Sequence, residues 1–585
     1  MKRREQSQTE QLRQALAERE AQLQEAQVRL AALEGSTSLQ VGRALTAAAK
    51  RPGRSLVRLP RDLYRLWRHS GDSNHAQRRR AEPVRSFDAD RQEARLLTGL
   101  SGGTADQLVA ATVVGPAVQT AIDPYLRSVA LRPHDAQIVM DAVDVDLLLV
   151  SASAAAPGSP WAHVGDPAVV DRTRALHWVM ESAASRGIPA VLLDDAPAPP
   201  ALRRLGFDRI HKGDAGVPLH LFNPVAAELA LGPEAVYVRT GVDTPVPDVL
   251  LELGVGVVDV DSPDLADALR AANVAVIPEN TPGEAGLHRR AWACGTRVVA
   301  HPAVPVPGGE DLTVSVPRLR ALGPTQREVR TMLRQVFLDD ATPVRLAALL
   351  DGLELTTAVP GGGLPLSGRG VAVLADPDGE EQADRLAEDL LSSRLRPAEV
   401  VVPDTAARLP GLRRLRSEGV TVRTVRFDAP DTPADLTRDD NDAAPGGLTP
   451  RQWADLAERA TMPWAFMWTG PTGRNRLVDL ACAAECSGAD AVGTPRETAE
   501  GIEPTATGTG DLGFFDRSTG TGQYVYVTGI DPELARTELL RRAWGPREWN
   551  RRGSRLLALG PDHGTGTDSG GEDPTHADAS TGALG

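Results

Sequence analysis

Two carboxylates, an imidazole and two guanidiniums fall within one short stretch of the sequence, ENTPGEAGLHRR, which begins at Glu279. The basic members are His288, Arg289 and Arg290, and the second carboxylate belongs to Glu284. A guanidinium presents a planar fork of N–H donors that matches the oxygens of a phosphate or diphosphate. This group of residues therefore predicts a site for a phosphorylated ligand, with the two glutamates as further contacts to it.

The elements that would position these residues are a strand, a loop, a helix and a second strand within Asn273 to Ala300. An apolar run, Val274 to Ile277, predicts the first strand, and Leu287 to Cys294 predicts the helix. Gly295 follows where a helix end favours a positive φ. The loop before such a helix binds anions, because unpaired N–H groups and the helix dipole both point at it. The sequence thus contains a candidate nucleotide-sugar site.

A second interpretation of the same helix needs no ligand. Leu287, Ala291 and Cys294 share one face and predict a buried stripe. Arg289 and Arg290 would then lie on the solvated face, and their charges would serve only the fold.

The end of this helix resembles a known family. Ala293, Cys294, Gly295 and Thr296, followed by a Val-Val strand, match the donor-binding half of two-domain (GT-B) glycosyltransferases as they stand. Within that class the chain is most similar to the CgeB-like, spore-maturation-type glycosyltransferases. In that family a glutamate four residues before the Cys holds the donor ribose, and this chain has Arg290 there. The resemblance implies a fold with two Rossmann-like halves and a nucleotide-sugar donor as substrate, with no further cofactor.

The GT-B comparison extends to a turn upstream. Gly241 begins the sequence Gly-Val-Asp-Thr, which resembles the turn that enters the second half of the fold. Glycine there permits close approach of the backbone to a ligand. We therefore include Gly241 with Glu279, Glu284, His288, Arg289 and Arg290 among the predicted donor-binding residues.

The acceptor side is predicted in a long loop that follows a buried strand, Asp146 to Ala152. Loops at the carboxyl ends of parallel strands meet substrates, so Trp161, His163 and Asp166 become candidates. His163 or Asp166 would act as the catalytic base that activates an acceptor hydroxyl. Another strand ends in the paired acids Asp194 and Asp195, which bind a cation or a sugar hydroxyl, or else cap the next element.

The carboxyl-terminal part predicts a further α/β domain that resembles the nucleotide-binding half of GT-A glycosyltransferases. Such enzymes place an Asp-x-Asp at a strand end to hold a metal ion. Here the corresponding end reads Trp468-Thr469-Gly470-Pro471 and has no carboxylate, so no metal site is predicted. We expect 1–34 as coiled coil, 35–88 as basic amphipathic segment and linker, 89–235 and 236–354 as the two GT-B halves, 355–369 as linker, 370–558 as the GT-A-like domain and 559–585 as a disordered tail.

The amino-terminal region differs in composition from the rest. Residues 5–34 carry an a/d seam of Leu and Ala interrupted by Arg19, which predicts a short coiled coil and a homodimer. Leucine and arginine alternate between Leu56 and Arg68, as in an interfacial amphipathic segment. Residues 41–71 could bind an anionic membrane, pack on the protein's own body or bind nucleic acid. This region also resembles the extension of some actinobacterial envelope glycosyltransferases.

Composition narrows the class of protein. The chain has 585 residues, 41% hydrophobic and 24% charged, which is typical of several globular domains. No apolar run is long enough to cross a bilayer, so we expect a cytoplasmic protein that is peripheral to the inner membrane face. Residues 41–80 have a net charge of +9 within a chain of −14, so the positive charge is local and a nucleic-acid-binding body is not expected. Three cysteines fit a reducing compartment.

Two functions remain open from the sequence. The chain is a glycosyltransferase that moves a sugar from a nucleotide sugar to a cell-envelope or extracellular polysaccharide. Alternatively it is an inactive, glycosyltransferase-shaped scaffold that gathers envelope-polymer enzymes at the membrane. The missing metal carboxylates and the arginine at position 290 favour the scaffold, whereas the nearby acids favour the enzyme.

Overall fold

The computed structural model describes residues 108–225, 234–241, 244–279, 283–301, 311–353, 355, 364–427, 448–495, 497–498, 501–502 and 530–559. The predicted coiled coil, the basic segment 41–71 and residues 560–585 of the predicted tail lie outside these ranges, so they stay predictions. Leu559, the first residue of the predicted tail, is described and buried.

The strands of the described residues are β1 Val109–Val113, β2 Arg127–Ala130, β3 Leu147–Ser151, β4 Ala190–Asp194, β5 Arg209–Lys212, β6 Ala235–Arg239, β7 Gly256–Asp259, β8 Val274–Pro278, β9 Arg297–His301, β10 Val371–Leu374, β11 Glu399–Pro403, β12 Thr421–Val425, β13 Trp464–Met467, β14 Ala491–Pro495, β15 Glu497–Thr498, β16 Gly501–Ile502, β17 Ile530–Arg536 and β18 Leu556–Ala558. The α-helices are α5 Pro116–Ile122, α6 Ala136–Ala142, α7 Val170–Ser185, α8 Asp248–Glu252, α9 Leu265–Ala271, α10 Glu284–Ala293, α11 Leu312–Leu322, α12 Gln326–Gln335, α13 Thr342–Leu350, α14 Glu380–Ser392, α15 Pro410–Ser417, α16 Pro450–Arg459, α17 Arg476–Ser487, α18 Thr537–Leu540 and α19 Pro546–Arg551.

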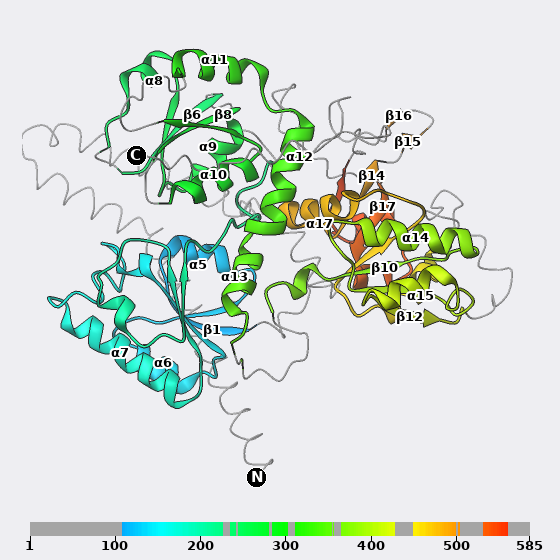
Figure 1. Cartoon of the computed structure of the whole chain (residues 1–585), viewed down its shortest axis with the longest axis horizontal. Coiled ribbons are helices and arrows are strands. Elements are labelled where there is room, and N and C mark those ends of the chain that lie inside the picture. Colours follow the sequence, from blue (N-terminus) through cyan, green and yellow to red (C-terminus); the bar gives the residue numbers. More distant parts are fainter. Residues whose placement is uncertain are drawn as a thin grey trace, which may run out of the picture. The chain divides into compact units, whose positions relative to one another are not determined.

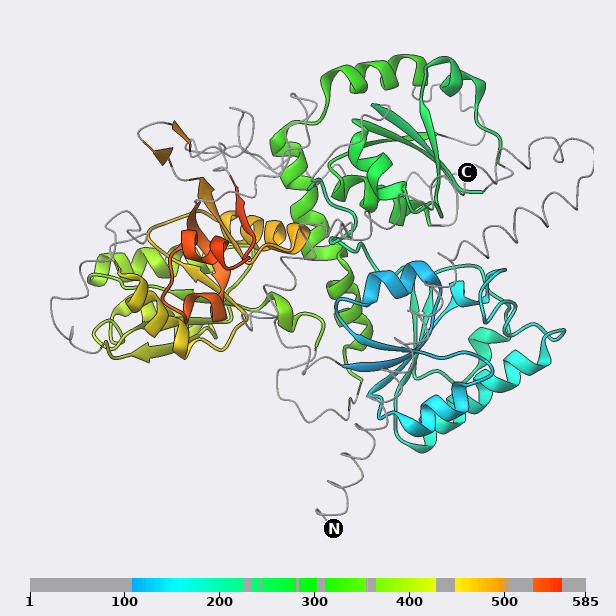
Figure 2. The ribbon, with the colours of Figure 1, turned by 180° about the vertical axis from the view of Figure 1, so that it is seen from behind.

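The first sheet is parallel and follows the order β2-β1-β3-β4-β5. Its central strands β1, β3 and β4 are mostly apolar because both of their faces are covered, whereas the edge strands β2 and β5 carry polar residues. Side chains from α6 and α7 pack on one face, and those from α5 and α13 pack on the other. Figure 1 shows these two helix layers, and Figure 2 shows the strands between them from behind. This first lobe is a doubly wound sheet whose order reverses between β1 and β3.

The second sheet is also parallel, with the order β7-β6-β8-β9. Alternate residues of its strands enter different cores. Tyr237 and Val276 pack with α8 and α11, whereas Val236 and Ile277 pack with α9, α10 and α12. This second lobe is therefore doubly wound as well, and its order reverses between β6 and β8.

The third sheet is mixed, with the order β12-β11-β10-β13-β17-β14-β18. β10 to β13 are parallel, and β17 runs antiparallel to both of its neighbours. Helices α14, α15 and α17 cover one face, and α16, α18 and α19 cover the other. A short hairpin of β15 and β16 stands apart from this sheet. The order β12-β11-β10-β13 is the arrangement of nucleotide-binding halves.

The chain passes between the first two lobes twice, at neighbouring places. Residues 213–217 lead out of β5, and a π-helical turn, Val336–Asp340, joins α12 to α13. The two segments pair: Val217 donates its N–H to the carbonyl of Asp340 (2.8 Å) and accepts from the N–H of Thr342 (3.0 Å). Gly216, with φ of +83°, lies so close that a Cβ there would be 2.7 Å from the Asp340 carbonyl oxygen. The connection is thus a narrow two-stranded bridge.

The α/β architecture with parallel sheets is confirmed, whereas the finer GT-B and GT-A assignments remain predictions. Cys294, Cys482 and Cys486 are buried thiols, as expected for core positions. In the described ranges no helix has the length and apolar character needed to cross a membrane.

Candidate functional site

Gly241 and Glu279 lie at the carboxyl edge of the second sheet, where its strand order reverses. Gly241 comes two residues after β6, and Glu279 directly follows β8, the parallel neighbour of β6. The N–H of Thr244 donates to the Gly241 carbonyl (2.9 Å), which closes a turn. The N–H of Glu279 donates to the carbonyl of His301 (2.9 Å), and its side chain is half-buried. Two predicted donor residues therefore occupy adjacent strand ends, where doubly wound sheets bind ligands.

Glu284 and His288 lie on the first turns of α10, which follows the same strand end. Gly283 precedes the helix with φ of +82° and, as a glycine, supplies no side-chain cap. His288 Nε2 is 3.8 Å from Glu284 Oε1, and each side chain is about a quarter exposed. Within the described residues this buried ring nitrogen has no hydrogen-bond partner. This atom is enclosed by the protein, and a donor-binding role for His288 stays a prediction.

Arg289 already has partners within the protein. Its Nη2 donates to Asp214 Oδ2 (3.1 Å), and its Nε is 3.6 Å from Asp340 Oδ1. Asp340 also pairs with Arg345. Asp214 approaches the helix closely, because a Cβ on Gly286 would be 2.4 Å from Asp214 Oδ2. Arg289 thus connects α10 to both segments of the bridge, and its role toward a diphosphate stays a prediction.

Arg290 is directed at Phe222, in the segment that enters the second lobe. Its guanidinium carbon is 5.2 Å from the centre of the Phe222 ring, a cation–π distance. Burial lowers the pKa of Arg290, and the negative charge of Asp214 opposes that shift. The ribose-binding position of the resembled family is therefore occupied by a cation that packs on an aromatic ring.

The residues of the Ala-Cys-Gly-Thr sequence support the fold. Cys294 and Thr296 are fully buried, and the Thr296 hydroxyl donates to the carbonyls of Leu269 (2.5 Å) and Ala272 (3.1 Å). Gly295 has φ of +74°, which confirms the predicted positive φ after the helix. These residues hold α10 against α9.

The predicted acceptor residues separate into core and surface. Trp161 is 2% exposed, and its indole N–H donates to the Leu131 carbonyl (2.8 Å), so it packs in the core of the first lobe. His163 is exposed and has φ of 60°, which is unusual for a residue other than glycine. Asp166 accepts from the N–H of Ala168 (2.8 Å) and shapes the turn before α7. The catalytic role of His163 or Asp166 stays a prediction.

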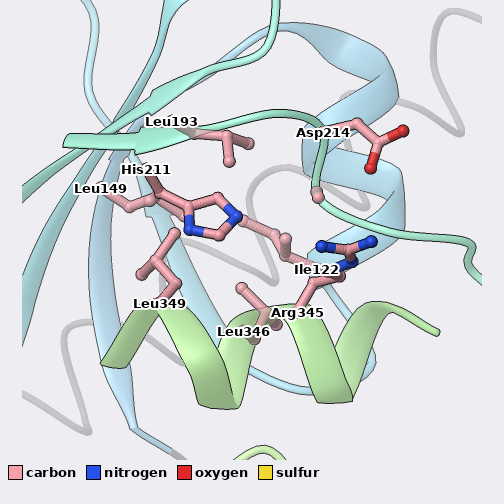
Figure 3. A pocket seen from close by; sticks show the side chains of 9 residues that line it. Ile122, Leu149, Leu193, His211, Asp214, Arg345, Leu346 and Leu349 are labelled. Carbon is pink, nitrogen blue, oxygen red and sulfur yellow. The ribbon is translucent and has the colours of Figure 1, made fainter. Parts of the chain in front are cut away.

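A recess lies between the first sheet and α13. His211 is at its centre, between the sheet residues Leu149 and Leu193 and the helix residue Leu349, with Asp214 near one end (Figure 3). The space is about 230 Å³ including solvent at its mouth, and no water-sized sphere fits inside. Burial lowers the pKa of His211, and the charges of Arg345 and Arg209 add to that effect. This recess is a packing gap rather than a ligand site.

The loop after β13, the counterpart of a metal motif, is held by an internal carboxylate. Asp389 of α14 accepts from the Trp468 indole (3.0 Å) and from the N–H groups of Thr472 (3.1 Å) and Gly473 (3.0 Å). Across the described parts of the chain, no three His, Cys, Asp or Glu residues gather in a way that could hold a metal ion.

Two residues matter here that the sequence did not single out. Asp214 is the partner of Arg289, yet its sequence context, Asp-Ala-Gly, signals only a turn. The sequence singled out Asp195 only together with Asp194, and in the structure the two carboxylates have different partners. Asp194 pairs with Arg203 (2.8 Å), whereas Asp195 accepts from the N–H of Ser153 (2.9 Å).

No protein-family model matches the chain, and no curated protein matches its sequence.

Proposed function

We propose that this chain binds a nucleotide sugar at the carboxyl edge of the second sheet and transfers the sugar to a hydroxyl of a polysaccharide. The observation that carries the proposal is the position of Gly241 and Glu279 on adjacent strand ends, beside the start of α10. Doubly wound sheets bind nucleotides at such a reversal point, and helix N-termini favour phosphate groups.

The donor contacts follow from the chemistry of each residue. The Gly241 backbone permits close approach of the ligand. The Glu279 carboxylate accepts hydrogen bonds from ribose hydroxyls, and His288 supplies the unpartnered ring nitrogen. Arg289 would exchange part of its contact with Asp214 or Asp340 for a diphosphate oxygen.

The transfer itself needs stabilisation of the leaving diphosphate. The N–H groups at the start of α10 and the guanidinium of Arg289 would take up the negative charge as the sugar departs. The acceptor is a cell-envelope or extracellular glycan, and the predicted amino-terminal segment would bring the enzyme to the membrane.

A second function is favoured by a separate observation. Arg289 pairs with two carboxylates and Arg290 packs on Phe222, so both cations are accommodated without a ligand. A non-catalytic scaffold of the same shape would be expected to satisfy its charges in this way.

Thermal unfolding with a panel of nucleoside diphosphates and nucleotide sugars separates the two functions. A ligand present at 100 times its Kd stabilises the folded chain by about 2.7 kcal/mol, so we expect at least one member, such as UDP-glucose or GDP-mannose, to raise the Tm. Glu279→Ala should lower the affinity for that ligand about tenfold or more, because a ribose hydroxyl loses its hydrogen-bond acceptor.

Glu252→Ala is the matched control, because Glu252 is an exposed glutamate of the same lobe on α8. It should leave the affinity unchanged. If no member of the panel shifts the Tm of the full chain, the enzyme proposal is wrong and the scaffold is preferred.

A further inference from the structure

A polar cluster at the carboxyl edge of the first sheet has no role in donor binding. It consists of Gly115, Ser151, Ser153 and Asp195. Gly115 comes two residues after β1, Ser151 ends β3, and Asp195 directly follows β4. Ser153 lies in the short 3-10 turn, Ala152–Ala155, that follows β3. The strand order reverses between β1 and β3, so the cluster occupies the ligand-binding position of this sheet.

Hydrogen bonds connect the four residues in series. The N–H of Gly115 donates to Ser151 Oγ (3.0 Å), the hydroxyls of Ser151 and Ser153 are 2.8 Å apart, and the N–H of Ser153 donates to Asp195 Oδ1 (2.9 Å). Ser151 is fully buried, whereas Ser153 and Asp195 are half-buried. The chain of hydrogen bonds therefore begins inside the lobe and ends on a carboxylate that reaches its surface.

Gly115 leaves this edge of the sheet without a side chain next to Ser153. A Cβ at that position would be 2.6 Å from Ser153 Oγ and 3.1 Å from Ser153 Cβ. Any other residue would displace the Ser153 side chain. The hydroxyl and the carboxylate are thus held next to a piece of backbone without a side chain of its own.

The two neighbouring acids, Asp194 and Asp195, differ in their partners. Arg203 donates to Asp194 Oδ1 through Nε (3.0 Å) and Nη2 (2.8 Å). In the part of the chain that the structure describes, no arginine or lysine pairs with Asp195. Burial raises the pKa of Asp195, although hydrogen bonds from the side chain and the N–H of Ser153 oppose that shift. A partly desolvated carboxylate without a cation is a better proton acceptor than one neutralised by arginine.

We propose that Ser153 and Asp195 bind a hydroxyl group of the acceptor glycan and that Asp195 is the base of the transfer. This rests on the proposed glycosyl transfer. The acceptor oxygen forms a bond to the anomeric carbon of the donor sugar as the bond from that carbon to the diphosphate breaks. The hydroxyl proton moves to the Asp195 carboxylate, and the electron pair of the broken bond leaves with the diphosphate. Besides binding the hydroxyl, Ser153 orients the Asp195 carboxylate through its N–H.

The test uses the full chain and the nucleotide sugar that raises its Tm, with water as the acceptor. Release of the nucleoside diphosphate is followed over time, and donor affinity is measured separately. Asp195→Asn should lower the rate at least about 100-fold, the usual contribution of a general base, with donor affinity and Tm close to wild type. Asp194→Asn, the adjacent control, should change the rate less than about threefold, because its carboxylate is already paired with Arg203.

The pH dependence distinguishes positioning from simple support of the fold. The rate of nucleoside diphosphate release should fall at acid pH as Asp195 takes up a proton. This acid limb of the pH–rate profile should be absent in Asp195→Asn. Ser153→Ala removes a hydrogen bond that lowers the pKa of Asp195, so the limb should move to higher pH. Equal rates in the Asp194 and Asp195 variants, with donor binding intact, would overturn this inference and leave the proposed function standing. Absence of donor binding in wild type would overturn both.

Discussion

In two regions of the molecule, arginines pair with a carboxylate. The two regions differ in how exposed these charged side chains are to solvent. At the junction of α12 and α17, Arg334 forms a bidentate pair with Asp479 (2.5 and 2.7 Å), and their side chains are 8% and 1% exposed. On α10, Arg289 contacts Asp214 at 3.1 Å, and their side chains are 20% and 25% exposed. Arg330 stands 3.8 Å from Asp479 as a second cation at the buried junction.

The difference shows which arginine can serve a ligand. A fully desolvated pair cannot separate without leaving a charge uncompensated in the interior, so Arg334 is committed to the fold. The pair of Arg289 and Asp214 is less completely withdrawn from water, so Arg289 is the better candidate of the two for the proposed diphosphate contact. Sequence alone shows arginines on helices in both places and does not distinguish them.

The largest expected effect is at the buried junction. Asp479→Ala removes the carboxylate that faces Arg334 and Arg330, which should cost about 3–5 kcal/mol of stability. Urea unfolding followed by circular dichroism would measure the loss. The triple variant Asp479→Leu with Arg334→Met and Arg330→Met should recover most of it, because apolar side chains then replace all three ions. A loss below about 1 kcal/mol would show that the ion pair at this junction stabilises the fold no more than the Arg289–Asp214 pair on α10.

The pair on α10 should be weaker and more sensitive to salt. Arg289→Ala is expected to cost about 1 kcal/mol or less, and the cost should shrink in 1 M NaCl, where the screening length is about 3 Å. Arg318→Ala, at an exposed position of α11, should have no measurable effect and serves as control. The cost of Asp479→Ala should hardly change with salt. Equal salt dependence of both costs would contradict the distinction between the two regions.

The smallest effect is expected at an exposed pair at the start of α12. Glu328 Oε2 is 2.7 Å from Arg297 Nη2, and its side chain is 46% exposed. Burial opposes ionisation of Glu328, but hydrogen bonds from Thr325 and Arg297 outweigh it and lower the pKa. Glu328→Gln keeps the capping partner of Thr325, so we expect a cost of about 0.2–1 kcal/mol at pH 7.

The sign of its pH dependence follows from the lowered pKa. The stability that ionised Glu328 contributes is present above its unfolded pKa of about 4.3 and is lost as the pH falls through the lower folded pKa. Tm differences between wild type and Glu328→Gln should therefore close below pH 4. A difference that stays constant from pH 7 to pH 3 would show that the ion pair contributes nothing.

Much of the local structure could be predicted from the sequence, because apolar runs and glycines act over a few residues. The run Val274–Ile277 became β8 with one residue added, and the helix after it begins at Glu284 instead of Leu287. These elements depend on spacing that is visible within one turn or strand.

The partners of the candidate site residues could not be predicted in this way. Arg289 meets Asp214 across 75 residues of sequence, and Arg334 meets Asp479 across 145. Such pairs depend on how whole lobes pack, and no local pattern encodes them. Trp161 shows the same limit, because its place in a loop at a strand end predicted a role on the acceptor side, whereas the structure buries it in the core of the first lobe.

The paired crossing between the first two lobes restricts how they can move. A single covalent connection would let one lobe swivel in any direction. Here two strands of chain lie side by side and are fastened to each other by the Val217 hydrogen bonds to Asp340 and Thr342. Neither segment can shift along the other without breaking these hydrogen bonds, so the two connections behave as one unit.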